Sequence, residues 1–310
     1  MKRNIVLSIF VVIAIVGCCK IKNNNSIQDV ANLTSSEYKL LLNPEYFDDY
    51  KQGFEDYWSI IQEVAAEQNI PILESDKPLT LGLRHVGFFD TQNFDLRKKG
   101  YVIRRRIALK KGERKLGVEY CLKYRSADPQ NVTTADVTIA EGYTPKDDDI
   151  VLESDIVYNS ILNQKTETVF SVQNSIELND NPPMTIGEFA KIYPVLSTLE
   201  ISLDEELLLV TGAESVEYKV KLGKLDFGDE LYGKMSMSVW RVELEGKQLS
   251  IPEFSFDHPF HEDHKYSTES MELCTSFINK LYERNPEWAT LGKSKTASLY
   301  ELADNLKTSK

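Results

Sequence analysis

The stretch from Phe88 to Arg125 constrains the fold of this 310-residue chain more than any other. Between Arg97 and Arg125 it holds twelve Lys and Arg residues against two acids, whereas the whole chain has a net charge of −12. Apolar and cationic residues alternate from Tyr101 and again from Val118, and the side chains of a strand alternate between the two faces of a sheet. The stretch therefore predicts two strands, each with one apolar and one cationic face.

Three further stretches alternate in the same way, so we expect five strands of one design. The charged residues on these faces are Glu37 and Lys39, Arg104 and Arg106, Lys123 and Arg125, Lys219 and Lys221, and Arg241 with Glu243 and Glu245. One interpretation is an antiparallel sheet with a solvated face. However, cations that face one another repel unless an anion lies between them. If helices cover the apolar faces, the charged faces point into a barrel or cleft that binds an anion.

Helices are predicted outside the strands. An apolar stripe with helical spacing runs over 53–68, and two amphipathic helices are predicted over about 267–307. The strand pattern stops between about 147 and 199, where Thr185 and Glu188 form a capping box for a short helix. We therefore predict a helical insertion over about 147–199 that lies outside the sheet.

The N-terminal segment has the pattern of a secretory signal. Lys2 and Arg3 precede an apolar run of about a dozen residues, too short to span a bilayer comfortably. The run ends at Ile-Val-Gly-Cys, which resembles a bacterial lipobox and predicts acylation of Cys18. The alternatives are an ordinary signal peptide or an uncleaved anchor. We expect a lipoprotein signal peptide over 1–17, a tether over 18–32, and a protein anchored to an inner or outer membrane of the bacterial cell envelope.

Composition limits the partners. Removal of Lys2 and Arg3 with the signal would leave a net charge of −14, which argues against nucleic acid or an anionic bilayer as the partner of the whole surface. The cationic stretch would then be a small site within an acidic body. Beyond the two cysteines at the lipobox only Cys121 and Cys274 remain, and they form neither a disulfide framework nor a metal motif.

The motifs inside the cationic stretch resemble those of the CYTH-like, or triphosphate tunnel, superfamily. That family shows a YFDT motif, then dLrkrGyaLRiR, then LtLK, and the matches span about forty residues. The matching residues are Phe89-Asp90-Thr91, Leu96-Arg97, Gly100, Arg104, Arg106 and Leu122-Lys123. The resemblance implies an α+β fold, an eight-stranded antiparallel tunnel barrel with flanking helices, over residues 33–310.

The resemblance extends to both ends of the sheet. Family members open with Glu-x-Glu-x-Lys, where this chain has Ser35-x-Glu37-x-Lys39, and Glu243-x-Glu245 matches a later Glu-x-Glu. In the family, Arg and Lys hold a triphosphate and glutamates hold Mg²⁺ or Mn²⁺, which suits the preference of these metals for carboxylate and phosphate oxygens. The implied phosphate-binding residues are Lys39, Arg104, Arg106, Lys123, Arg125, Lys219, Lys221 and Arg241, and the implied metal-binding and catalytic residues are Glu37, Glu243 and Glu245.

Two functions remain open at this point. The first is a metal-dependent hydrolase of triphosphate or polyphosphate, in which a metal-activated water attacks a terminal phosphorus. The second is a catalytically silent module that binds a phosphorylated or other anionic ligand, or a partner protein. Ser35 favours the second function, because a metal site needs several anionic ligands and the first family glutamate is missing. The intact Glu243-x-Glu245 favours the first.

Overall fold

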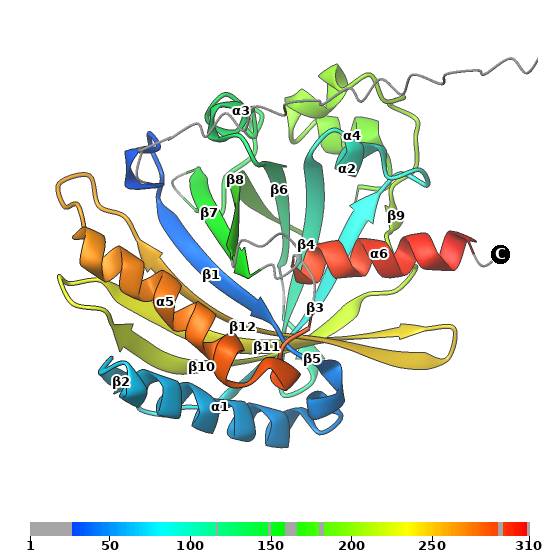
Figure 1. The fold of residues 1–310 in the computed structure, drawn as a ribbon. Helices are drawn as coiled ribbons and strands as arrows, with labels where there is room; N and C mark the ends of the chain where they lie inside the picture. The colour runs from blue at the N-terminus through cyan, green and yellow to red at the C-terminus, as the bar shows by residue number, and fades with distance from the viewer. Residues whose placement is uncertain are drawn as a thin grey trace, which may run out of the picture.

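The computed structural model describes residues 27–115, 117–147, 150–158, 166–179, 183–290 and 294–308. Nine strands in this part of the chain close into a barrel (Figure 1). Their spatial order is β10 (Ser215–Asp226), β11 (Tyr232–Leu244), β12 (Lys247–Pro259), β1 (Ser35–Leu41), β7 (Val151–Tyr158), β8 (Thr166–Leu178), β6 (Val118–Ser126), β4 (Tyr101–Lys110) and β3 (Leu81–Asp90), and β3 pairs with β10 to close the ring. The prediction of a tunnel barrel is confirmed.

The barrel differs from the prediction in strand number and direction. It has nine strands among the described residues where eight were expected, and β1 runs parallel to β7 while the other neighbouring pairs of the ring are antiparallel. The parallel pair is possible because β1 and β7 are not joined by a tight turn: β3, β4 and β6 of the barrel lie between them in the sequence. A mixed barrel of this kind still points alternate side chains inward.

The segment predicted as a helical insertion over 147–199 instead supplies two of the barrel strands. β7 and β8 form an antiparallel pair there, and the helices that follow are short: α4 (Ile186–Ala190) and η4 (Pro194–Thr198). The prediction is therefore wrong over most of this range. The sequence of β8 begins Thr-Glu-Thr-Val-Phe-Ser-Val, and its β-branched and aromatic residues favour a strand over a helix.

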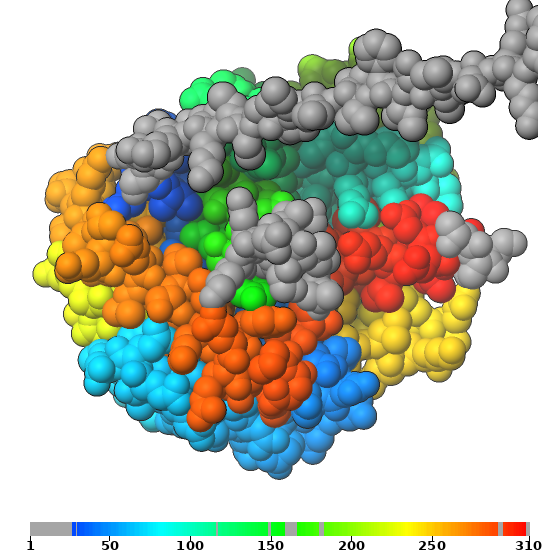
Figure 2. Space-filling model, viewed as in Figure 1, coloured from blue at the N-terminus to red at the C-terminus, as the bar shows by residue number. Residues whose placement is uncertain are grey.

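Two long helices cover one side of the barrel from outside (Figures 1 and 2). α1 (Tyr50–Glu67) begins after Asp49, whose carboxylate accepts hydrogen bonds from the first-turn N–H groups, and α5 (Thr268–Arg284) begins after Ser267 in the same manner. Their apolar stripes pack on the outward residues of β1, β10, β11 and β12. This core includes Tyr38, Tyr57, Ile61, Val220, Met237, Phe254, Phe277 and Leu281.

The opposite wall is covered by α3 (Pro129–Thr133), α4 and η4. Thr185 and Glu188 form the predicted capping box at the start of α4, with both reciprocal hydrogen bonds present. The outward residues of β4, β6 and β8 pack beneath these short helices. This second core includes Ile103, Tyr120, Leu122, Val172, Ile186, Phe189 and Tyr193.

A third core lies where α6 (Lys295–Thr308) packs on one end of the barrel (Figure 1). At this end the inward residues are apolar, and they meet the buried side chains of Leu299, Tyr300 and Ala303 on α6. The inward residues of this core include Leu41, Val86, Phe88, Val102, Trp240, Val242 and Ile251. The barrel interior is therefore apolar beside Leu299, Tyr300 and Ala303, and its ionic part lies farther along the strands, beside the start of α6.

The remaining elements are short. They are η1 (Ile27–Asp29), η2 (Pro44–Phe47), β2 (Ile72–Glu74), α2 (Asp95–Lys98), β5 (Glu113–Arg114), β9 (Leu208–Leu209) and η5 (Pro286–Trp288). None of the helices in the described part of the chain is long and apolar enough to cross a membrane. The predicted signal peptide, Cys18 and most of the tether lie outside the described residues.

Candidate functional site

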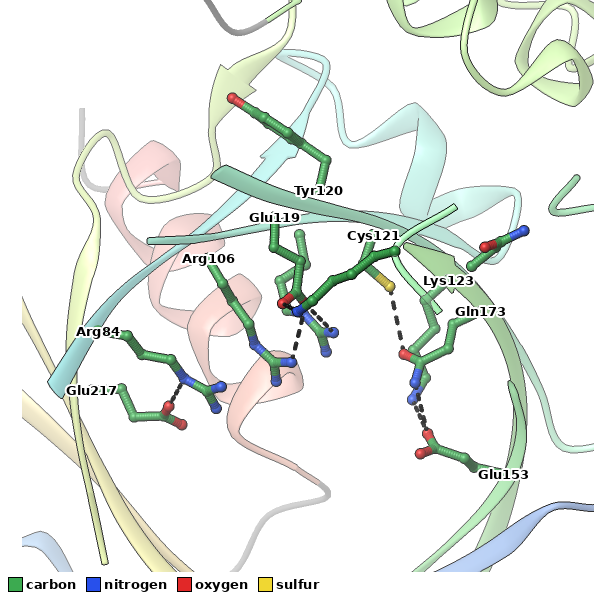
Figure 3. A network of polar contacts seen from close by, with 12 residues as sticks. Arg84, Arg106, Glu119, Tyr120, Cys121, Lys123, Glu153, Gln173 and Glu217 are labelled. Atoms are coloured by element: carbon green, nitrogen blue, oxygen red, sulfur yellow. Dashed lines mark hydrogen bonds and ion pairs between the residues drawn. The ribbon is translucent and has the colours of Figure 1, made fainter. Parts of the chain in front are cut away.

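The barrel encloses a cavity of about 180 Å³ with a largely ionic wall. All nine strands contribute side chains to it, and so does the start of α6. Figure 3 shows Arg84, Arg106 and Lys123 extending from separate strands toward this space, while Tyr120 points to the outer side of the sheet. The cationic lining residues are Lys39, Arg84, Arg104, Arg106, Lys123, Arg125, Lys219 and Lys295, and the acidic ones are Glu37, Glu153, Glu217 and Glu253.

Strand alternation places these side chains, as the sequence predicts. On β4, Arg104 and Arg106 point inward while Arg105 points outward, where it pairs with Glu214 at 2.7 Å. The same rule places Lys123 on the inner face of β6 beside the outward Leu122. Seven of the eleven predicted site residues line this one cavity: Glu37, Lys39, Arg104, Arg106, Lys123, Arg125 and Lys219.

One cluster of buried ion pairs centres on Asp155, which is 1% exposed. Its carboxylate lies 2.6 Å from the Lys39 ammonium and 3.1 Å from the Arg125 guanidinium, and Lys39 also lies 2.7 Å from Glu37. Burial alone would raise the pKa of Asp155, but Lys39, Lys123 and Arg125 hold it well below its usual range. Asp155 therefore carries a full negative charge at neutral pH and holds two of the cavity cations in place.

The other acids of the wall are also paired. Glu153 lies 2.8 Å from Lys123, and Glu253 lies 3.1 Å from Lys295. Glu217 forms an ion pair with Arg84 and lies 3.8 Å from Lys295. Burial would raise the pKa of Glu217, but Lys295 and Arg84 lower it below its usual value. Each acidic residue that lines the cavity thus already has a cationic partner.

The cations, in contrast, are not all satisfied. The Nε–H groups of Arg104, Arg106 and Arg125 are buried without a hydrogen-bond partner among the described residues. Within the same residues Lys219 forms no ion pair, and burial together with the nearby Lys295 lowers its pKa. Burial and repulsion from Arg104 and Arg84 lower the pKa of Arg106 to about 9. Each unpaired buried donor costs about 1–3 kcal/mol, so the cavity favours an anion with several oxygens.

Several cavity residues are missing from the sequence-based prediction. Arg84 precedes the inward Val86 by two residues, and Glu217 precedes the inward Lys219 by two residues. The alternation of β3 and β10 therefore predicts that both side chains point inward. Glu153 and Asp155 were hidden by the predicted helical insertion. Lys295 has no signal in the sequence, since only tertiary packing brings the start of α6 to the barrel.

Four predicted site residues lie elsewhere. Lys221 is exposed where the pairing of β10 with β11 shifts register. On β11 the inward residues are Ser236, Ser238 and Trp240, so the predicted face is the wrong one. The guanidinium of Arg241 instead donates to the carbonyl oxygens of Phe47 at 3.1 Å and Asp48 at 2.5 Å on the outside. Glu243 and Glu245 are exposed. The cause is the α6 core, which draws the apolar side of β11 inward.

The predicted Mg²⁺ or Mn²⁺ ligands do not fit a metal site. Glu37 lines the cavity, but Glu243 and Glu245 lie on or beyond the outer face of β11, so the three carboxylates do not converge. In the described ranges no group of three His, Cys, Asp or Glu residues is placed to hold a metal ion. Near Glu37, Asp155 is engaged by Lys39 and Arg125, while Asp257 lies opposite Glu37 on β12 and its pKa is raised by burial and by the Glu37 charge.

The FFDT motif has a structural role. Asp90 is 1% exposed and accepts hydrogen bonds from the backbone N–H groups of Thr91, Leu96 and Arg97 at the start of α2, and from the hydroxyl of Tyr300 on α6. The motif therefore joins the turn after β3 to α6, and Phe88 lines the cavity whereas Asp90 and Thr91 do not.

Comparison with known proteins yields structural likeness alone. No model of a protein family and no curated protein matches the chain. Among solved structures, it is similar to a Hippeastrum protein described as a candidate adenylyl cyclase with a dominant triphosphatase activity, at 13% identity and a TM-score of 0.41, over 87% of this chain and 95% of that one. It is also similar to a candidate adenylate cyclase of Bacillus halodurans, at 10% identity and a TM-score of 0.37, over 84% and 93% of the two chains.

A third solved structure, of a protein from Pyrococcus horikoshii OT3, is 13% identical with a TM-score of 0.34, over 86% of this chain and 98% of that one. The cavity of this chain, enclosed by a closed barrel with inward arginines and lysines, has the form that the resemblance to the CYTH-like superfamily predicts.

Proposed function

We propose that the barrel binds a short oligophosphate, either a triphosphate-bearing molecule or inorganic polyphosphate. The observation that carries the proposal is that the Nε–H groups of Arg104, Arg106 and Arg125 around one cavity have no hydrogen-bond partner, and Lys219 no ion pair, within the described part of the chain. A guanidinium can bind two phosphate oxygens at once, and a lysine acts as a point charge. An oligophosphate would satisfy these donors and relieve the mutual repulsion that lowers the pKa of Arg106.

The cavity size suits such a ligand. One water takes about 30 Å³ of liquid volume, so a cavity of about 180 Å³ has room for several water-sized groups. Ion pairs with lysine or arginine engage the four carboxylates that line the cavity, those of Glu37, Glu153, Glu217 and Glu253.

We favour binding over hydrolysis for this chain. The carboxylates that the family resemblance implies as metal ligands are separated, and the acids of the cavity are paired with cations. Neither arrangement supplies a set of free carboxylates for a divalent ion. A silent binding module, the second function left open by the sequence, therefore fits the geometry better than a metal-dependent hydrolase.

Isothermal titration calorimetry with tripolyphosphate tests the binding function. Arg106→Gln removes a charge-assisted contact worth about 1.5–3 kcal/mol, so we expect affinity to fall by about tenfold or more. Arg241→Gln is the matched control, because Arg241 lies outside the barrel and its replacement should leave affinity unchanged. Equal affinity of the parent and Arg106→Gln, or no binding by the parent, would contradict the proposal.

The same samples test hydrolysis. Release of phosphate from tripolyphosphate or ATP is measured with added Mg²⁺ or Mn²⁺, and we expect none above the rate without protein. Metal-dependent release by the parent that is lost in Arg106→Gln would establish the hydrolase instead.

We further propose that Cys18 carries a lipid anchor that holds the barrel at a membrane of the bacterial envelope. The support is the sequence alone: the short apolar run, the lipobox-like Ile-Val-Gly-Cys and the polar residues that follow. Labelling of cells with a fatty acid should mark the parent and leave Cys18→Ala unlabelled. Equal labelling of both proteins would refute the anchor.

A further inference from the structure

The start of α6 reaches into the cavity. Ser294, Lys295 and Thr296 line it beside the barrel strands, although this segment follows the last barrel strand by more than thirty residues. Lys295 is 9% exposed and is the only cation of the wall, among the described residues, that does not come from a strand. The cavity is thus completed by a helix that is not part of the barrel.

The ammonium of Lys295 is surrounded by barrel residues. It lies 3.1 Å from Glu253 and 3.8 Å from Glu217, donates to the hydroxyl of Ser238, and lies 4.9 Å from the centre of the Trp240 ring. These contacts come from β10, β11 and β12. Lys295 therefore joins α6 to three adjacent strands of the tunnel wall.

Glu253 and Glu217 attract the ammonium of Lys295, whereas its place in the helix and a neighbouring lysine oppose it. A cation in the first turn of a helix opposes the helix dipole, and its removal from water adds to the cost. Lys295 also repels Lys219, which lines the same cavity, and this repulsion helps lower the pKa of Lys219. An anion in contact with both ammonium groups would be attracted to both and would offset the repulsion.

The rest of α6 is held by separate contacts. The hydroxyl of Tyr300 donates to Asp90 at 3.1 Å, and the Arg97 guanidinium lies 4.5 Å from the centre of the Tyr300 ring. Lys307, at the far end, donates to the carbonyl oxygen of Gln92 at 2.7 Å. Because these contacts lie away from the cavity wall, the charge at position 295 can be removed while the other end of α6 stays packed.

We propose that α6 is part of the ligand site: Lys295 contacts the bound oligophosphate, so that occupancy of the tunnel stabilises the packing of α6 on the barrel. This inference rests on the proposed binding function and adds to it a residue from outside the barrel. By linkage, whatever strengthens the packing of α6 also tightens ligand binding, and by the same factor.

Calorimetry with tripolyphosphate and the full-length protein tests the contact. Lys295→Met keeps the length of the side chain and removes its charge, and we expect affinity at least about tenfold weaker. Lys295→Arg should bind within a few-fold of the parent. Lys307→Met is the matched control, since it removes the same charge from the other end of the same helix, and its affinity should equal that of the parent.

Hydrogen exchange tests the coupling without any substitution. Tripolyphosphate should slow the exchange of the α6 amides in the parent, and should not do so in Lys295→Met. If the parent binds tripolyphosphate while α6 exchange is unchanged and Lys295→Met binds equally well, the inference is wrong and the binding function stands. If the parent does not bind, both are wrong. If Lys295→Met does not fold, the exchange measured on the parent decides.

Discussion

The ion-pair cluster around Asp155 allows a quantitative prediction. Asp155→Asn keeps the shape of the side chain and removes a charge that is 1% exposed and contacts both Lys39 and Arg125. Removal of one partner from a buried ion pair costs about 3–5 kcal/mol, because the other charge remains buried and unpaired. Here the lower end applies: Lys39 keeps Glu37 at 2.7 Å, and the Arg125 side chain is 25% exposed. We expect the free energy of unfolding to fall by about 3 kcal/mol.

Urea unfolding followed by tryptophan fluorescence measures this change, because Trp58 and Trp288 belong to the core under α1 and α5 and Trp240 to the core beside α6. For a domain of this size, a loss of about 1 kcal/mol in the free energy of unfolding lowers Tm by about 2 °C. The Tm of Asp155→Asn should therefore be about 6 °C below that of the parent. Glu245→Gln, at an exposed turn, is the control and should change neither value. If the parent and Asp155→Asn are equally stable, the ion pairs of Asp155 contribute no net stability and the expected loss of about 3 kcal/mol is refuted.

The difference in unfolding free energy between the parent and Asp155→Asn should change with pH in a defined direction. The pKa of Asp155 is lowered in the folded protein, so its contribution is complete above the unfolded value of about 4 and is lost as the pH falls below it. The stability gap between the parent and Asp155→Asn should therefore be constant from pH 7 down to about pH 5 and narrow at lower pH. A gap that widens on acidification would contradict the assignment of a charged Asp155.

Three further predictions follow from the wall and the motifs. Gly100→Ala should cost about 2 kcal/mol more than Gly112→Ala by urea unfolding, because both glycines have positive φ but only at Gly100 would the new Cβ lie 2.7 Å from the Tyr124 ring. Glu243→Gln should leave tripolyphosphate affinity unchanged in calorimetry, because Glu243 is exposed outside the cavity. A loss of affinity would show that Glu243 takes part in binding. Tripolyphosphate affinity should fall as the pH rises toward 10.5 and Lys219, whose pKa is lowered, loses its charge; the fall should be smaller in Lys219→Met, and an identical profile would refute this role.

Much of the site could be predicted because two-residue alternation is a local property. Arg104 with Arg106, and Lys123 with Arg125, point the same way in any strand that contains them. Their convergence needed only the further premise that facing cations surround an anion. The carboxylates were harder to predict. Glu153 and Asp155 lie in a segment whose residues suit a helix or a strand, and its pairing partners in β1 and β8 decide between the two.

The errors on β11 have a different cause. An alternating strand has two faces, and the sequence shows that they differ without showing which one is inside. On β4 and β6 the apolar side is covered by helices outside the barrel, so the charged side faces the cavity. On the end of β11 the order is reversed, because Trp240 and Val242 pack inward against the core of α6. The helix that supplies Lys295 to the cavity is therefore the same helix that turns Glu243 away from it. A single tertiary contact, absent from any local pattern, both adds a cation to the wall and separates the carboxylates that the family resemblance brings together.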